Sequence, residues 1–297
     1  MTKLGIVGLG RMGGAMSQRL RQHGFDVVGW DRDAAAGRAL AADGLRIAGN
    51  PREVAADAEI IISSITEDHG ARRIFAGPDG FLKADVTGKL FIEMSTLQPM
   101  TGRELAPLVE VAGARLIEAP VLGTIPQVRA GTLFAMVGGR AEDVARAGTV
   151  LETLTRRIVH MGGNGSGYAM KLAANLGLGA YVVALAESLA LGCRQGLPLD
   201  RMIEALQESA TACGWLKSKA DVLNGGTAEM TLDIATLRKD LMSAVATGAL
   251  DGVPMPLAAG ALASLSAAVA DGHGGGDIAE LPKCFRDAML QNFDRLS

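Results

Sequence analysis

The chain has 297 residues, of which 48% are hydrophobic and 21% are charged, and its formal net charge is −3. This composition excludes a disordered or collagen-like chain, and the length favours two domains at a usual size of about 150 residues each. Because the 29 basic and 32 acidic residues form no block of like charge, we expect neither a nucleic acid nor a membrane as a partner.

The first half of the chain alternates short β-branched runs with helical runs. Strands are predicted at residues 4–7, 26–30, 58–65, 89–93, 115–118 and 133–137, and helices at residues 12–23, 99–112 and 142–154. Such βαβ alternation predicts an α/β domain whose doubly wound, mainly parallel sheet carries helices on both faces.

Residues 162–167 are rich in turn formers, and no convincing strand follows them. We therefore predict a dinucleotide-binding domain at residues 1–163 and a second, all-helical domain for substrate binding and oligomerisation at residues 164–297. Helices are predicted there at residues 168–194, 198–207, 232–250, 256–270 and 282–293. The first of them is a long interdomain helix, and we expect the active site in the cleft between the two domains.

The cysteines Cys193, Cys213 and Cys284 are widely spaced and odd in number, which favours reduced thiols in a cytoplasmic protein. The four histidines show no ligand spacing, so no metal site is expected. The N-terminus lacks the pattern of a signal peptide. The most apolar stretch, residues 176–186, has 11 residues and is too short to cross a bilayer, which needs about 20.

A glycine-rich turn after the first strand predicts dinucleotide binding. Its sequence is Gly8-Leu9-Gly10-Arg11-Met12-Gly13. In such a turn the first glycine permits the sharp bend, the second lets a pyrophosphate approach the backbone, and the third lets the helix pack against the strand. The amides at the helix N-terminus then meet the phosphates. A tight turn that binds nothing is the alternative reading.

Two residues at the end of the second strand bear on the choice of cofactor. Asp31 lies where a carboxylate can hydrogen-bond both ribose hydroxyls of NAD and repel the additional phosphate of NADP. Arg32 argues the opposite way, because an arginine there can pair with that phosphate or stack on adenine. The balance favours NAD over NADP. Arg11 in the turn either faces the pyrophosphate or covers the surface.

A lysine on the predicted interdomain helix is the candidate catalytic residue. Gly167, Lys171 and Asn175 are spaced four apart and share one helix face. The surrounding helix is apolar, and desolvation lowers the pKa of a lysine toward the range useful for proton transfer. Asn175 offers an amide that can orient a substrate. A lysine that reaches solvent at the helix entrance is the structural alternative.

Five motifs in order along the chain resemble those of the β-hydroxyacid dehydrogenases. This group contains 3-hydroxyisobutyrate dehydrogenase and tartronate semialdehyde reductase, and the chain also resembles 6-phosphogluconate dehydrogenase. The motifs are Gly8 to Gly13, Glu93-Met94-Ser95-Thr96, Ala119-Pro120-Val121, Gly165-Ser166-Gly167 with Lys171 and Asn175, and Leu237-Arg238-Lys239-Asp240-Leu241. The resemblance implies a Rossmann-type first domain.

The resemblance also implies roles for individual residues. Lys171 would be the general acid/base at the substrate hydroxyl, and Asn175 would help to hold the substrate. Thr96 and the Ser64-Ile65-Thr66 segment would border the nicotinamide. Lys239 would close over the cofactor, with Asp240 supporting the substrate site. A single group of tuned pKa fits this chemistry, because alcohol oxidation needs a base where carbonyl reduction needs an acid.

The sequence departs from the family pattern where the substrate carboxylate is expected. The usual Ser-Gly-Gly is replaced by Leu122-Gly123-Thr124, so the serine hydroxyl is absent. The amides of Gly123 and Thr124 and the Thr124 hydroxyl can still bind an anion, and Leu122 makes this edge more apolar. Arg129 either compensates or is a surface charge, and Ala174 replaces the first of two paired asparagines.

We therefore expect an NAD(P)-dependent oxidoreductase that acts on a small-molecule substrate, a 3-hydroxy acid or its semialdehyde. The apolar helices of the second domain favour a homodimer or homotetramer. Two alternatives remain. An imine reductase shares the architecture but usually replaces the lysine, and a non-catalytic dinucleotide-binding module would not need Lys171.

Overall fold

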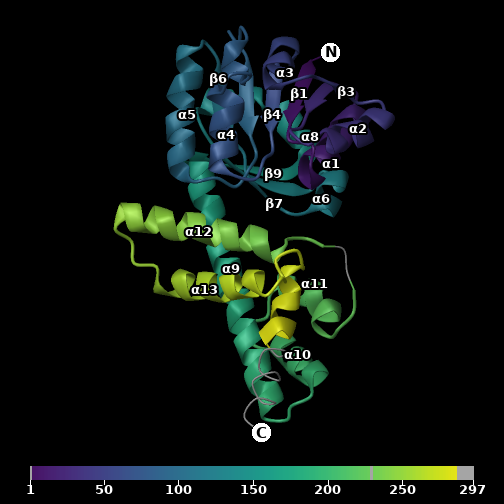
Figure 1. Cartoon of the computed structure of the whole chain (residues 1–297), viewed down its shortest axis with the longest axis vertical. Coiled ribbons are helices and arrows are strands. Elements are labelled where there is room, and N and C mark those ends of the chain that lie inside the picture. The colour runs from purple at the N-terminus through teal and green to yellow at the C-terminus, as the bar shows by residue number, and fades with distance from the viewer. Residues whose placement is uncertain (1, 228–229, 286–297) are drawn as a thin grey trace. The chain divides into compact units, whose positions relative to one another are not determined.

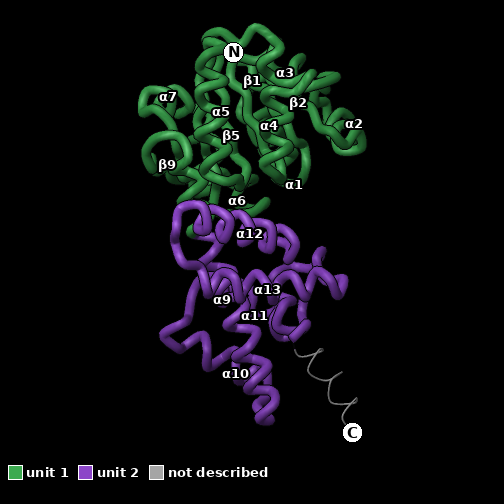
Figure 2. The backbone as a smooth tube through the Cα atoms, turned by 60° about the vertical axis from the view of Figure 1, so that its left-hand side comes forward, with its two compact units in different colours: residues 1–173 green, residues 174–297 purple. Residues whose placement is uncertain are grey.

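The computed structural model of the chain describes residues 2–227 and 230–285 (Figure 1). The chain forms two compact units, residues 1–173 and 174–297, shown in green and purple in Figure 2. They divide inside the long helix α9 (Ser166–Arg194). The start of this helix belongs to the first unit because Tyr168 is completely buried in the core of that unit.

The strands of the first unit form a single sheet within the described residues, in the order β3-β2-β1-β4-β5-β6-β8-β7, with β9 paired to β8. The six strands from β3 to β6 are parallel, whereas β8 runs antiparallel to β6 and β7. The parallel order is that of a Rossmann fold, which confirms the predicted fold class. The strands are β1 (Lys3–Val7), β2 (Asp26–Trp30), β3 (Arg46–Ile47), β4 (Ile60–Ser63), β5 (Leu90–Glu93), β6 (Arg115–Glu118), β7 (Val121–Leu122), β8 (Leu133–Gly138) and β9 (Thr155–Gly162).

Helices cover both faces of this sheet, because alternate strand residues point to opposite sides. Ile60 and Ile62 belong to one hydrophobic cluster, whereas Ile61 between them belongs to another. The first cluster includes side chains of α1, α6 and α8, and the second those of α3, α4 and α5. The helices are α1 (Arg11–Gln22), α2 (Ala34–Ala42), α3 (Pro51–Asp57), α4 (Asp68–Ala76), α5 (Pro99–Val111), α6 (Ile125–Ala130), α7 (Ala141–Arg146) and α8 (Gly148–Leu154), with a short 3₁₀ helix at Phe81–Lys83.

Helices joined by loops make up the described residues of the second unit, with one isolated bridge between Asp233 and Asp277. Its helices after α9 are α10 (Leu199–Gln207), α11 (Gly214–Leu223), α12 (Ile234–Asp251) and α13 (Pro256–Ala270), with a 3₁₀ helix at Ile278–Glu280. Residues 281–285 are helical. The remainder of the helix predicted at residues 282–293 lies outside the described residues.

The helix α9 is longer than the apolar stretch recognised in the sequence. By length and composition alone its 29 residues could cross a membrane, and 44% of its most apolar window is buried within the structure. Val182, Ala186 and Leu189 belong to the two hydrophobic clusters of the second unit. This pattern is typical of a core helix.

Candidate active site

A cavity of about 420 Å³ opens at the carboxyl ends of β1, β2 and β4 in the first unit. Ligands of doubly wound α/β sheets bind at this edge. The cavity brings together seven of the predicted cofactor residues: Gly8, Gly10, Asp31, Arg32, Ser64, Ile65 and Thr66. Its wall is completed by residues that the sequence did not single out, among them Trp30, Asn50 and Arg73.

The glycine turn fits a dinucleotide. Gly8 has φ +93°, and a Cβ there would lie 2.1 Å from the carbonyl oxygen of Ser64. A Cβ at Gly13 would lie 1.8 Å from the carbonyl oxygen of Gly8. A Cβ at Gly10 would meet nothing within 4 Å. The protein itself therefore requires Gly8 and Gly13, whereas Gly10 leaves space in front of the turn.

The N-terminus of α1 is suited to an anion. Its N-cap is Gly10, which offers no side-chain hydrogen bond, and its first turn contains no acidic residue. The amides of this turn and the helix dipole therefore present positive charge where a pyrophosphate would lie. These residues would hold the phosphates of NAD or NADP.

Asp31 holds the same turn. Its Oδ2 accepts a hydrogen bond from the amide of Leu9 at 2.5 Å, and its Oδ1 accepts one from the amide of Asp33 at 2.7 Å. The carboxylate therefore supports the conformation of the glycine turn as well as lining the cavity.

Other predicted cofactor residues of the first unit do not line this cavity. Leu9 and Arg11 line a second, more open cavity of about 410 Å³ together with Ile125 and Arg129. Met12 packs against a hydrophobic cluster. Thr96 is half-buried just beyond β5. The glycine turn thus separates two hollows, and only one of them includes Asp31.

The predicted substrate loop has its polar groups engaged. Thr124 is the N-cap of α6, and both its amide and its hydroxyl donate to Oε1 of Gln127, at 2.9 and 2.7 Å. Leu122 is 38% exposed, and Gly123 has φ +124°. An anion can use the Thr124 donors only by displacing the Gln127 side chain.

Lys171 and Asn175 lie one turn apart on α9. Lys171 is half-buried, and Asn175 is buried with 5% exposure. In the second unit, the Asn175 amide donates to Oδ2 of Asp240 at 2.6 Å, and Nζ of Lys239 lies 2.8 Å from Oδ1 of the same carboxylate. Asp240 therefore fixes the orientation of the Asn175 amide and brings it together with Lys239.

Comparison with known proteins identifies the family. A sequence model for the NAD-binding domain of 6-phosphogluconate dehydrogenase matches residues 3–163, and one for the NAD-binding region of NADP-dependent 3-hydroxyisobutyrate dehydrogenase matches residues 165–285. The chain belongs to the β-hydroxyacid dehydrogenase family. As a member of it, the protein is an oxidoreductase that acts on hydroxy acids with a nicotinamide dinucleotide, as the sequence predicts.

Named relatives agree with this family. The chain is 34% identical to the 3-hydroxyisobutyrate dehydrogenase of Pseudomonas aeruginosa over 96% of its length and 99% of that protein. It is 32% identical to the 2-(hydroxymethyl)glutarate dehydrogenase of Eubacterium barkeri, with 86% of each covered. Among solved structures, the 3-hydroxyisobutyrate dehydrogenase of Mycobacterium tuberculosis with L-serine has a TM-score of 0.85 at 30% identity, covering 96% of this chain and 99% of that one.

In this β-hydroxyacid dehydrogenase, the structure also reveals two buried carboxyls to which the sequence analysis gave no role. Glu93 and Glu118 end β5 and β6, and they stand in register on these neighbouring strands. Burial raises the pKa of each to about 7, against the opposing effect of hydrogen bonds from Ser95 and Tyr168 to Glu93 and from Gly165 and Tyr168 to Glu118. The signal in the sequence is the repeated pattern of an apolar triplet or pair followed by glutamate, Leu90-Phe91-Ile92-Glu93 and Leu116-Ile117-Glu118.

Proposed function

We propose that this β-hydroxyacid dehydrogenase transfers a hydride between NAD and a small 3-hydroxy acid or its semialdehyde, with Lys171 as the general acid/base. The observation that carries the proposal is the position of Lys171 on α9, one turn before Asn175, in a chain whose glycine turn fits a dinucleotide. The substrates named for two relatives, 3-hydroxyisobutyrate and 2-(hydroxymethyl)glutarate, are both 3-hydroxy acids, as is the L-serine of the similar structure.

Each of these residues has a separate role in the proposed reaction. When bound, the nicotinamide supplies or accepts the hydride. In the oxidation, Lys171 takes the proton of the substrate hydroxyl, and in the reduction it returns a proton to the carbonyl oxygen. Asn175, whose amide is held by Asp240, orients the substrate. Gly8, Gly10 and Asp31 would hold the dinucleotide.

The proposal for Lys171 is tested by nicotinamide absorbance with NAD or NADP and a panel of 3-hydroxy acids. Lys171→Ala should lower kcat by about 100- to 10,000-fold while cofactor affinity stays unchanged, because general acid–base catalysis contributes that much. Lys217→Ala, at an exposed lysine of α11, is the matched control and should retain full activity. Turnover that survives in Lys171→Ala would remove the acid/base assignment, and turnover of cyclic imines alone would identify an imine reductase.

The preference for NAD rests on Asp31, whose carboxylate lines the cavity beside the glycine turn. Asp31→Asn should lower the ratio of NAD to NADP affinity by about tenfold, because the negative charge that repels the additional phosphate is removed. Asp33→Asn is the control, since Asp33 caps α2 through the amide of Ala35. An unchanged ratio in Asp31→Asn would contradict the preference.

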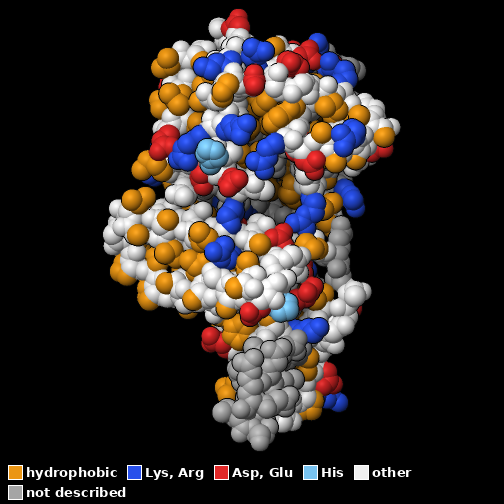
Figure 3. All heavy atoms as spheres, in the orientation of Figure 1, with side chains coloured by type: hydrophobic (Ala, Val, Ile, Leu, Met, Phe, Trp, Pro, Cys, Tyr) orange, Lys and Arg blue, Asp and Glu red, His pale blue; other side chains and the backbone are white. Residues whose placement is uncertain are grey.

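We also propose that the protein is a homodimer or homotetramer. Hydrophobic side chains gather on the second unit near the junction of α12 and α13 (Figure 3), where Leu250, Val253 and Leu257 are between 51% and 71% exposed. Exposed apolar patches of this kind mark association sites. Sedimentation that shows only a 30.7 kDa species at micromolar concentration would contradict an oligomer.

A further inference from the structure

A cluster of buried polar groups connects the wall of the cofactor cavity to the beginning of α9. Its centre consists of the two carboxyls that end β5 and β6, Glu93 and Glu118, both with 0% exposure. Parallel strands lie about 4.8 Å apart, so these two side chains are close neighbours. The groups that donate hydrogen bonds to them are hydroxyls and amides, which are neutral.

Tyr168 of α9 bonds to both carboxylates. Its hydroxyl donates to Oε2 of Glu93 at 2.6 Å, and its amide donates to Oε2 of Glu118 at 3.5 Å. The amide of Gly165 donates to Oε1 of Glu118. The first turn of α9 is therefore attached to the ends of two strands. Lys171 follows Tyr168 by three residues, and side chains at this spacing are neighbours on a helix.

The same cluster reaches the cofactor cavity through Ser95. The Ser95 hydroxyl donates to Oε1 of Glu93, and its amide donates to Oε2 at 2.9 Å. The Ser95 hydroxyl oxygen also accepts a hydrogen bond from the amide of Ile65 at 2.8 Å. Ile65 lines the cavity. An unbroken chain of hydrogen bonds thus runs from Ile65 through Ser95 and Glu93 to Tyr168.

The space around Glu118 depends on glycines from three elements. A Cβ at Gly102 of α5 would lie 2.0 Å from Oε1 of Glu118, and a Cβ at Gly138 of β8 would lie 2.8 Å from Oε2. A Cβ at Gly167 of α9 would lie 2.8 Å from the carbonyl oxygen of Met136. The missing side chains let the carboxylate and the start of the helix approach closely.

We propose that Glu93, Glu118 and Tyr168 are positioning residues that fix Lys171 relative to the Ile65 wall of the cofactor cavity. The inference rests on the proposed function of Lys171. An acid/base group must be held within a fraction of an ångström of the reacting atoms, and a displacement of about 1 Å can cost 100-fold in rate.

The cluster also makes this positioning sensitive to pH. With the pKa of both carboxyls raised to about 7, the pair holds a proton near neutrality that two ordinary carboxyls would have lost. As the pH rises further, two neighbouring negative charges repel each other beneath the first turn of α9. Charged groups nearby include Asp68 of α4, whose negative charge raises the pKa of the Tyr168 hydroxyl, and Arg103 of α5, which lies beside Gly165.

The test uses the full-length chain with Tyr168→Phe and Glu93→Gln, and with Phe81→Leu as a control in the same hydrophobic cluster. We expect kcat to fall about 10- to 100-fold in the first two variants, with cofactor Kd changed less than about twofold and the pH profile of kcat altered near neutrality. Phe81→Leu should lower the melting temperature and leave kcat and its pH profile unchanged. An unaltered kcat and pH profile in Tyr168→Phe, or an equal change in Phe81→Leu, would overturn the proposal.

A second readout does not require turnover. The rate at which an amine-reactive reagent labels Lys171 is measured by peptide mass spectrometry between about pH 6 and about pH 9. Tyr168→Phe should change this rate by about threefold or more, while Phe81→Leu and the labelling of Lys217 stay constant. If no hydroxy acid is turned over, the proposed function fails and the labelling still tests the positioning. If Lys171→Ala alone abolishes turnover and the labelling rate is unaltered by Tyr168→Phe, only the positioning role fails.

Discussion

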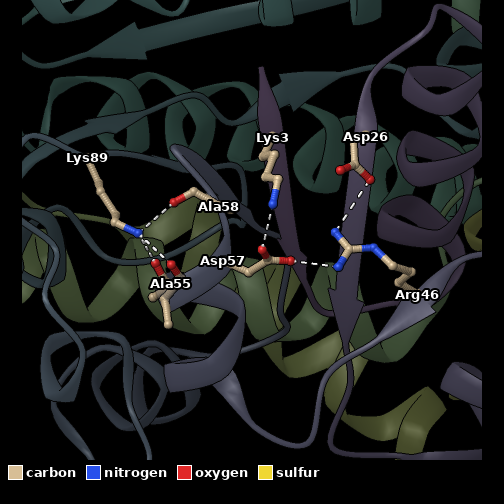
Figure 4. A network of polar contacts seen from close by, with 8 residues as sticks. Lys3, Asp26, Arg46, Ala55, Asp57, Ala58 and Lys89 are labelled. Atoms are coloured by element: carbon tan, nitrogen blue, oxygen red, sulfur yellow. Dashed lines mark hydrogen bonds and ion pairs between the residues drawn. The ribbon is translucent and has the colours of Figure 1, made fainter. Parts of the chain in front are cut away.

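The acidic side chains at the two edges of the parallel sheet differ in their burial and in their partners. At the amino-terminal edge, shown in Figure 4, Asp57 pairs with Lys3 at 3.1 Å and with Arg46 at 2.8 Å, and Arg46 also reaches Asp26 at 3.4 Å. These side chains are between 31% and 52% exposed. At the carboxyl-terminal edge, Glu93 and Glu118 are buried among neutral donors.

This difference gives the two edges opposite responses to pH. Hydrogen bonds from Lys3 and Arg46 lower the pKa of Asp57, so its contribution to stability is lost as the pH falls through that lowered value. Burial raises the pKa of Glu93 and Glu118, so the folded state is stabilised by protons that are lost as the pH rises toward 7. At the edge that carries the cofactor cavity, the two buried carboxyls thus accept hydrogen bonds from neutral hydroxyls and amides.

The largest effect is expected from a methyl group added to the glycine turn at the carboxyl-terminal edge of the sheet. Gly13→Ala places a Cβ 1.8 Å from a backbone oxygen, which cannot give way as a flexible side chain would. We expect a loss of about 3 kcal/mol or more in the free energy of unfolding, measured by denaturant titration, together with loss of cofactor binding. Gly10→Ala should leave stability unchanged and weaken cofactor binding alone. A stable Gly13→Ala variant that binds the cofactor would disprove this account of the turn.

Removing one buried carboxyl should flatten the pH dependence of stability. Between the usual pKa of 4.5 and the folded value of about 7, the folded state keeps a proton that the unfolded state has lost, so stability falls as the pH rises. Each carboxyl can contribute up to about 3 kcal/mol to this fall, which levels off above the folded value. Melting temperatures of the wild type and Glu93→Gln across this window measure the effect. Parallel curves for the two proteins would count against a raised pKa of Glu93 in the folded state.

The smallest effect is expected at the amino-terminal edge. Arg46→Ala removes two exposed ion pairs and should cost less than about 1 kcal/mol, with the difference shrinking at high salt. Cofactor affinity and the pH profile of kcat should stay at their wild-type values. A change in either of these would show that the two edges are coupled through the sheet.

The sequence predicts the parallel core well, because its strands are apolar runs bounded by clear helix signals. The antiparallel and edge strands are harder. The two-residue strands β3 and β7 have no periodicity to detect, and β9 exposes Arg156 and Arg157 on an edge. The predicted helix at residues 142–154 is interrupted at Ala147, directly before Gly148, and a glycine inside a helical pattern weakens the helix without specifying a break.

Two other differences involve buried polar groups. The helix α11 was not among the predicted helices, and its Lys219 is 3% exposed and forms a buried ion pair with Asp277 at 2.8 Å. Glu93 and Glu118 likewise look like ordinary strand ends until the register of β5 and β6 places them together. Local pattern predicts which residues are apolar and cannot predict a partner that is distant in sequence.

The glycines around Glu118 have a consequence for mutational tolerance. A map of activity against every single substitution should mark Gly102, Gly138 and Gly167 as positions that accept no side chain, although none of them offers a functional group. Such a map would detect that the space beside these glycines is already filled by the Glu118 carboxylate or by backbone atoms. Variant data alone could therefore reveal a buried polar cluster, because the glycines around its buried acid would tolerate no substitution.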